Sequence, residues 1–428
     1  MTGILEDVIQ REAEATLILH ESRETSVTFD ANRLKRIENT EAYKQDLQVI
    51  RDGKLGSAGS TRVGGEKELL DNAFSVAEFG PSVGYTFPGR ETYAQPKVFD
   101  QRVADITVDE MIAVGEDIID FVKSLDSSIN GGAQVQKSVS EVSVKNTNGV
   151  DVNSRKTIFA VMAGYQFVEG KNMLSSWDWQ IMTSLQYDLE SMKAKLKEDF
   201  EVGRKNVSIA PGSYDVLFTP AAFSDIVNPI MACIDGRAVM RGISPFAGRL
   251  GEEVFAPSFS LIEDGTLCGA VGSRPCDEQG VPCRRTPLID EGVLKEYLLD
   301  LESARRLGRE PIGTGSPTGA RPNNVIVPGG DVSFDDLMAG MKRGIIIDQT
   351  MGAWAGNPYT GTVTGNIALG YLVENGKKVG RVKDCMFSLN VFNHLKTNLL
   401  ALTKETKSLG GLILPYCLIG GVSISGRN

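Results

Sequence analysis

Glycine is unevenly distributed along the chain, and this distribution constrains the fold more than any other feature. Of the 46 glycines, 15 lie in residues 1–202 and 31 in residues 203–428. Because glycine marks turns, a segment with so many turns favours strands over long helices. The sequence therefore predicts an α+β fold, with a mixed α/β N-terminal region followed by a large strand-rich C-terminal domain. We expect three units: an N-terminal α/β region at 1–100, a central helix-and-hairpin region at 101–205, and the strand-rich domain at 206–428.

Apolar residues at helical spacing predict several helices. One begins after Thr107, because Thr107 and Glu110 have the spacing of a capping box, in which each side chain satisfies a free backbone N–H at the helix start. A stripe of apolar residues from Ile181 to Leu196 predicts another helix. Further helices are expected over 66–79, after Thr219, and over 393–403.

Pairs of turn residues predict hairpins between neighbouring strands. Strands over 258–262 and 266–271 are expected to flank Asp264-Gly265. The segment 310–324, rich in glycine and proline, is predicted to be a mobile loop. Other hairpins are centred on Asp52-Gly53, Asn148-Gly149, Asp290-Glu291-Gly292 and Asn375-Gly376.

Charge and histidine content exclude two classes of function. The chain has 45 Lys and Arg against 55 Asp and Glu, a net charge of -10, whereas binding to a phosphate backbone needs a surplus of Lys and Arg. We therefore expect no direct contact with nucleic acid. The only histidines, His20 and His394, are 374 positions apart. No metal site or protease motif built on two neighbouring histidines is possible.

The sequence favours a cytoplasmic protein that does not enter a membrane. Its first residues, MTGILEDVIQREAEA, are acidic where a signal peptide would be basic. Residues 408–426 are uncharged over 19 positions, but Pro415 and four glycines interrupt them. Such interruptions favour short strands over a transmembrane helix.

The sequence offers few candidates for catalytic groups. Cys276 and Cys283 lie near Arg284, and a cationic neighbour lowers the pKa of a thiol, so these are the best candidates for a nucleophile. His394 could act as a general base, although a packed histidine is the commoner outcome. The turn carboxylates, of which Asp277 is one, could bind a hard metal ion or simply face water.

Five stretches resemble the TldD/PmbA (TldD/TldE) family of peptidase-related proteins. The longest is DEQGVPCRRTPLIDEGVLKEYLLDLESARRLG, and another is GNPYTGTVTG. Together the stretches extend over essentially the whole chain. They occupy Leu47–Thr61, Val142–Val152, Asp277–Gly308, Asn323–Gly330 and Gly356–Gly365.

The resemblance implies a chain without zinc. TldD-like members carry H-E-x-x-x-H on a helix, and the two His, with a later Cys, look like zinc ligands. An ungapped match places Val227, Asn228 and Ala232 at these positions, and the Cys would fall around Ala401. None of these side chains can act as the ligand or the base. The chain is thus most similar to the metal-free member PmbA (TldE), and we expect no catalytic residue, no metal ligand and no cofactor, zinc being expected only in a TldD-like partner.

The resemblance also implies a role in proteolysis. Such chains pair with a TldD-like subunit in a peptidase that acts on unfolded peptides, and this chain alone is expected not to be catalytic. An older family label, modulator of DNA gyrase, describes an indirect effect. Two alternatives remain open: a homodimeric peptide-binding scaffold, and a stand-alone peptidase with unrecognised chemistry. Polarity and motif position nominate Arg284, Arg285 and Asn357 for the substrate cleft; the arginine pair could hold a peptide carboxylate or face water.

Overall fold

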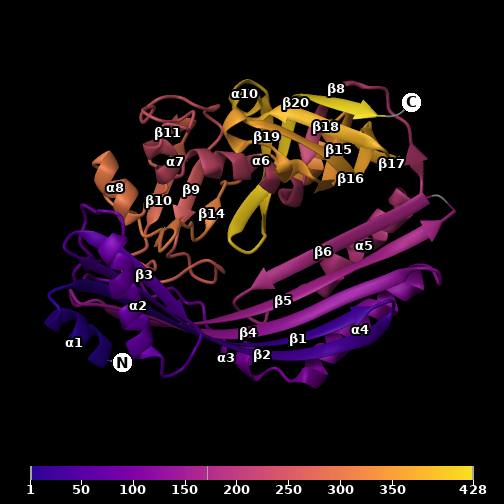
Figure 1. The fold of residues 1–428 in the computed structure, drawn as a ribbon. Helices are drawn as coiled ribbons and strands as arrows, with labels where there is room; N and C mark the ends of the chain where they lie inside the picture. The colour runs from indigo at the N-terminus through magenta and orange to yellow at the C-terminus, as the bar shows by residue number, and fades with distance from the viewer. Residues whose placement is uncertain (1, 171, 427–428) are drawn as a thin grey trace.

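The computed structural model describes residues 2–170 and 172–426. Its N-terminal half is built on one long, curved antiparallel sheet of six strands in the order β3-β2-β1-β4-β5-β6 (Figure 1). This sheet takes strands from both of the first two expected units. The strands are β1 (Glu14–Asp30), β2 (Arg33–Arg51), β3 (Lys54–Ser60), β4 (Asn130–Asn146), β5 (Asp151–Glu169) and β6 (Asn172–Met182).

Five helices accompany this sheet within the described residues. The predicted capping box starts α4, where the Thr107 hydroxyl accepts a hydrogen bond from the Glu110 N–H and the Glu110 carboxylate accepts one from the Thr107 N–H. Helices α4 and α5 pack against the same face of the sheet, and their apolar side chains share one core with it. The helices are α1 (Thr2–Gln10), α2 (Glu66–Phe79), α3 (Gln101–Asp105), α4 (Val108–Leu125) and α5 (Leu189–Gly203).

The C-terminal domain is rich in short strands, as predicted. Its main sheet has twelve strands and closes on itself, because β18 pairs with both β16 and β20. The strands are β7 (Asn206–Val207), β8 (Gly212–Phe218), β9 (Leu261–Asp264), β10 (Arg285–Asp290), β11 (Val293–Leu294), β14 (Val325–Ile326), β15 (Arg343–Met351), β16 (Thr362–Glu374), β17 (Lys377–Val382), β18 (Cys385–Asn390), β19 (Leu399–Ser408) and β20 (Leu412–Gly426).

Helix α6 (Pro220–Cys233) packs into the core of this domain. Thr219 caps it, and Pro220 occupies its first turn, as the sequence predicts. The smaller elements of the domain are α7 (Gly236–Met240), α8 (Leu301–Leu307), α9 (Phe334–Gly340), α10 (Val391–Thr397), the 3-10 turns η1 (Ala353–Ala355) and η2 (Pro358–Thr360), and the strand pair β12 (Gly315–Ser316) and β13 (Gly319–Ala320).

The α+β architecture is confirmed, and three predictions of a helix or strand are wrong. The helix expected from Ile181 starts only at Leu189, because Ile181 and Met182 pair with β5 and Asp188 caps the helix. Residues 266–271 form turns rather than a strand, because the Asp264 carboxylate accepts bonds from the Thr266 N–H and hydroxyl. The helix expected to reach residue 403 ends at Thr397, where the chain turns to pair as β19 with β20.

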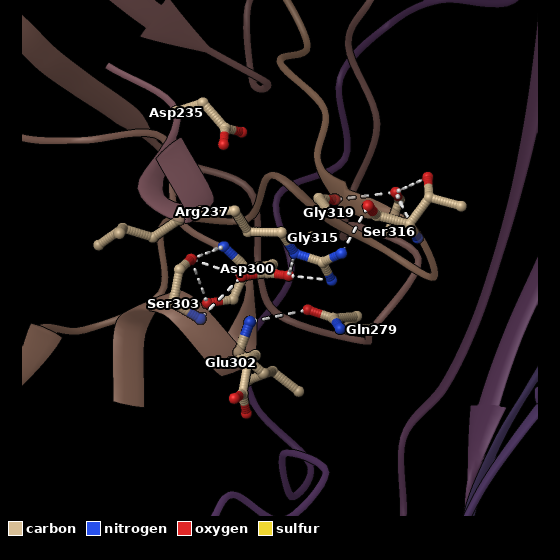
Figure 2. Close-up of polar contacts among 12 residues, drawn as sticks. Asp235, Arg237, Gln279, Asp300, Glu302, Ser303, Gly315, Ser316 and Gly319 are labelled. Atoms are coloured by element: carbon tan, nitrogen blue, oxygen red, sulfur yellow. Dashed lines mark hydrogen bonds and ion pairs between the residues drawn. The ribbon is translucent and has the colours of Figure 1, made fainter. Parts of the chain in front are cut away.

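The predicted mobile loop 310–324 is instead tethered by buried polar contacts (Figure 2). The Arg237 guanidinium bonds the buried Asp300 carboxylate at 2.6 and 2.9 Å and also donates to the Thr318 carbonyl. The Gly315 N–H donates to Asp277 over 2.6 Å. These contacts satisfy polar groups that no sequence pattern had paired, so the loop is part of the folded core.

Candidate functional site

A cavity of about 690 Å³ lies where the N-terminal sheet meets the C-terminal domain. We call it the β6 cavity. Residues 177–182 of β6 form one wall, and α5 forms another. The C-terminal domain closes it with the start of α6, with Asp348 and Gln349 of β15, and with residues 405–408 of β19. The cavity therefore lies between two parts of the chain that are far apart in sequence.

The outer edge of β6 is open toward this cavity. Strand β6 is the last strand of its sheet and pairs with β5 alone among the described strands. The Gln349 amide donates to the Trp177 carbonyl over 2.9 Å, so this carbonyl points away from β5. In an antiparallel strand the N–H and C=O of one residue point to the same side and alternate residue by residue. Trp179 and Ile181 therefore present their backbone groups to the same open edge.

The half-buried Lys195 and the buried Asp199 and Asp348 lie together beside this edge. The Lys195 ammonium lies 2.6 Å from a carboxylate oxygen of Asp199 and 2.8 Å from one of Asp348. Asp199 also accepts bonds from the hydroxyls of Ser176, at 2.6 Å, and Tyr371, at 2.7 Å. The cluster thus joins β6, α5, β15 and β16.

The charges of this cluster are set by burial and by pairing. Burial disfavours the charged form of Lys195, but the two carboxylates outweigh burial and raise the pKa of Lys195. Burial raises the pKa of Asp348. Asp199 is also buried, but its bonds from Lys195, Ser176 and Tyr371 outweigh burial and lower its pKa. The pKa of Asp199 is thus lowered and that of Asp348 raised, as expected when two acids share one cation and one of them has additional hydrogen bonds.

The sequence reasoning missed this cluster, although two signals were present. Lys195 and Asp199 are four positions apart on one helix, which is the spacing of a helical ion pair. Asp348 directly follows the apolar residues 345–347, and a carboxylate within such a strand needs a partner. Neither signal indicates which partner the fold supplies.

The positions of the family's zinc motif lie on α6 and do not fit zinc. Val227 is 0% exposed in the apolar core, Asn228 is exposed, and Ala232 is half-buried. Ala401, where the Cys would fall, is half-buried on β19. Hydrocarbon side chains supply no donor to a metal. Across residues 2–170 and 172–426, no group of three or more His, Cys, Asp and Glu side chains is arranged to hold a metal ion.

The three cleft candidates make local contacts. Arg284 donates to the Pro311 carbonyl over 2.7 Å, and Arg285 lies 3.8 Å from the Asp264 carboxylate. Both arginines are exposed. The Asn357 side chain accepts a bond from the Tyr359 N–H and so caps η2. None of the three lines the β6 cavity, and their role in a cleft stays a prediction.

The thiol pKa values of the two cysteine candidates are shifted upward, whereas the sequence predicted a downward shift. Cys276 and Cys283 are both buried. Burial, outweighing nearby arginine, raises the pKa of Cys276 to about 12 and raises the pKa of Cys283 as well. The prediction that Arg284 activates a thiolate is therefore wrong: the cation that acts on both thiols is Arg274, and desolvation exceeds its effect. His394 bonds the Asn390 carbonyl at 2.9 Å, four residues before it in the sequence.

The chain is similar to known proteins over its whole length. The model of the PmbA/TldA metallopeptidase C-terminal domain matches residues 211–426. An uncharacterized protein of Methanocaldococcus jannaschii is 26% identical over 426 residues, which cover 96% of each chain. The crystal structure of TldE from Thermococcus kodakarensis superposes with a TM-score of 0.91 at 20% identity and covers 100% of both chains. That of a proposed modulator of a DNA gyrase from Thermotoga maritima gives a TM-score of 0.91 at 24% identity and covers 99% of both.

Proposed function

The chain belongs to the PmbA/TldD metallopeptidase family, and we propose that it acts there as a PmbA/TldE-like subunit without catalysis of its own. The observation that carries this proposal is the set of residues that α6 has at the positions of the zinc motif. The positions that hold H-E-x-x-x-H in TldD-like chains hold Val227, Asn228 and Ala232, and Val227 is wholly buried. Activation of water by zinc needs donor ligands that these side chains lack.

The role that this proposal leaves to the chain is to hold a peptide. A strand edge with free N–H and C=O groups binds an extended peptide as an added strand. The edge of β6 at Trp179 and Ile181 has this character, and it forms a wall of the β6 cavity. An unfolded polypeptide offers the backbone that such an edge requires, whereas a folded protein has its own backbone groups paired.

The proposed partner is a zinc-bearing TldD-like chain, which would contribute the catalytic groups. A homodimeric scaffold is the second candidate, and it differs by needing no such partner. We also propose a cytoplasmic location, since all six cysteines are free thiols in the structure, as reducing conditions favour. None of the described helices is long and apolar enough to cross a membrane.

The proposal is tested with the purified full chain, alone and mixed with a TldD-like chain from the same organism. We expect no stoichiometric zinc in elemental analysis, no cleavage of casein-derived peptides by the chain alone, and cleavage by the mixture that exceeds that of the TldD-like chain alone. One zinc per chain together with chelator-sensitive cleavage by the chain alone would contradict the proposal. Absence of any effect on the partner, with a dimer of the chain in light scattering, would favour the scaffold.

A further inference from the structure

A second cavity, of about 700 Å³, lies against the face of the N-terminal sheet that is directed toward the C-terminal domain. We call it the β5 cavity. Strand pairing places Lys44, His20, Val142 and Ser154 in one row across four strands. Lys156 lies two residues beyond Ser154 on β5, and because side chains alternate in a strand it faces the same cavity. Residues 271–278 and 321–323 of the C-terminal domain form the opposite wall.

Lys156 is a half-buried cation without an acidic partner. Its ammonium donates to the Val271 carbonyl over 2.7 Å. No carboxylate among the described residues forms an ion pair with it, whereas the other lysine of the cavity, Lys44, lies 2.6 Å from Asp46. Burial, with a smaller contribution from the neighbouring Arg274, lowers the pKa of Lys156 to about 8. The ammonium therefore has two further donors and no charge to compensate its own.

Arg274 lies beside Lys156 and is only partly satisfied. Its Nε donates to the Asn323 side chain over 2.6 Å. The Glu278 carboxylate lies 3.6 Å from Nη1, which is beyond hydrogen-bond distance, and is shared with Arg321 at 3.7 Å, and the buried Asp277 carboxylate also acts on the Arg274 charge. A guanidinium has five N–H donors in a planar fork that matches a carboxylate. Asp277 and Glu278 both line the cavity near Arg274, whereas Lys156 has no acidic partner, so the unused donors of the two cations can still take up one further anion at Lys156.

We propose that the β5 cavity binds the C-terminal carboxylate of a peptide between Lys156 and Arg274. This inference rests on the proposed peptide-binding function. The site contains both parts that such a group needs: donors for the carboxylate, and apolar side chains for the last residue of the peptide. The apolar side chains are Ile18, Val142, Val144, Val152 and Ile158.

The position of the cavity relative to β6 supports a peptide rather than a small free anion. Residues 406–408 of β19 line the β6 cavity, and Gly411, directly before β20, lines the β5 cavity. The two cavities therefore share the end of the β19–β20 hairpin as a wall. In Figure 1 this hairpin descends from the C-terminal domain toward β5 and β6. A bound peptide that extends from the β6 edge around this hairpin therefore reaches the β5 cavity.

The test compares two probes that differ only in the terminal charge. Acetyl-Ala-Leu-Ala-Leu-Ala with a free carboxylate and the same peptide as its amide are titrated into the full chain by calorimetry. We expect the carboxylate to bind about tenfold more tightly or better, because charge-assisted hydrogen bonds exceed neutral ones by this order. Lys156→Met is expected to remove the preference for the carboxylate. The matched control is Lys145→Met, on the opposite face of the same sheet, where the lysine pairs with Asp151 at 3.1 Å.

A second measurement uses the unaltered chain, so it does not require any variant to fold. Acylation of the Lys156 amine in the unaltered chain is followed by mass spectrometry at pH 8, without ligand, with each peptide, and with inorganic phosphate. The free-carboxylate peptide is expected to slow the reaction at Lys156 severalfold, and the amide is not. Protection by phosphate but not by the carboxylate peptide would overturn the assignment of a peptide ligand.

The outcomes separate this inference from the function on which it rests. Equal binding of both peptides, with Lys156→Met unchanged, would overturn the carboxylate site and leave peptide binding intact. Failure of both peptides to bind would overturn the site and count against peptide binding, whereas zinc content and stimulation of a TldD-like chain would still test the subunit role separately.

Discussion

The ammonium of Lys195 lies 2.8 Å from a carboxylate oxygen of Asp348 and so joins two elements that are 153 residues apart. Lys195 is on α5, beside the N-terminal sheet, and Asp348 is on β15 of the C-terminal domain. Tyr371 of β16 bonds the other acid of the cluster, Asp199. The cluster thereby helps to fix the open edge of β6 against the C-terminal domain, which is the arrangement that forms the β6 cavity.

Removal of the shared cation is expected to destabilise the fold strongly. Lys195→Met leaves two buried carboxylates without their cation, and breaking a buried pair in this way costs about 3–5 kcal/mol. The measurement is the free energy of unfolding in urea at pH 7. Lys197→Met is the control, because Lys197 is exposed on the same helix and lies 3.9 Å from Glu201. A loss no larger than that of the control, about 0.5 kcal/mol or less, would contradict the role of the cluster.

Glu263 is expected to make stability fall as pH rises. Burial, only partly offset by bonds from Asn323, raises the pKa of Glu263 to about 7. Because the folded pKa exceeds that of the unfolded chain, the folded state binds more protons, and this contribution is complete below the unfolded pKa near 4.5 and lost as pH rises through about 7.

The variant Glu263→Gln isolates this effect. Its Oε1 can still accept the two bonds from Asn323, and the second carboxylate oxygen has no partner to lose. We expect equal unfolding free energies for variant and wild type at pH 4.5, and a variant more stable by about 2–4 kcal/mol at pH 8. Other buried acids titrate equally in both proteins, so the difference reports Glu263. A difference that is constant from pH 4.5 to 8 would rule out the raised pKa.

The open edge of β6 is expected to tolerate proline at one position and not at the next. Ile181 directs its N–H away from β5, so Ile181→Pro removes no ladder bond, and proline is accepted on such an edge. Peptide affinity is expected to fall about tenfold, because an edge donor is lost and the ring obstructs an added strand. The thermal midpoint is expected to change little.

Gln180→Pro is the matched comparison. Its N–H is directed toward β5, where Gln180 pairs with Val161, so proline there is expected to lower the thermal midpoint by several degrees. Fluorescence-detected melting and peptide binding by calorimetry give the two readouts. Unchanged peptide affinity in Ile181→Pro would exclude this edge as the binding site.

Arg237 is expected to hold the loop 310–324 in place. Arg237→Met leaves the wholly buried Asp300 carboxylate without its cation and frees the Thr318 carbonyl. Hydrogen exchange of residues 313–320 is expected to accelerate at least tenfold, with little change in β4 and β5. Arg306→Met is the control, because Arg306 is exposed and pairs with Glu302 on its own helix. Equal exchange in both variants would contradict the tethering role.

Sequence reasoning succeeded where the determining residues are close together in the chain. The capping box of Thr107 and Glu110 spans three positions, and helix α2 was predicted with its observed bounds of Glu66 and Phe79. It failed where partners are distant. Ile181 and Met182 have helical spacing to Leu189, but the whole of β6 is held in the sheet by pairing with β5. Tertiary pairing overrides local spacing in such cases.

By itself, the sequence determined the chemistry that is absent from α6: no folding can give Val227 or Ala232 a lone pair for zinc. It also determined the α+β class, because turn content and apolar spacing are local properties. Only the tertiary structure decided that Lys195 meets Asp348 and that Lys156 lies beside Arg274. These pairs are separated by more than a hundred residues, and their distances follow from how the sheet packs on the C-terminal domain. It also reversed the expectation for Cys276, because a pKa depends on burial, which a neighbour in sequence does not reveal.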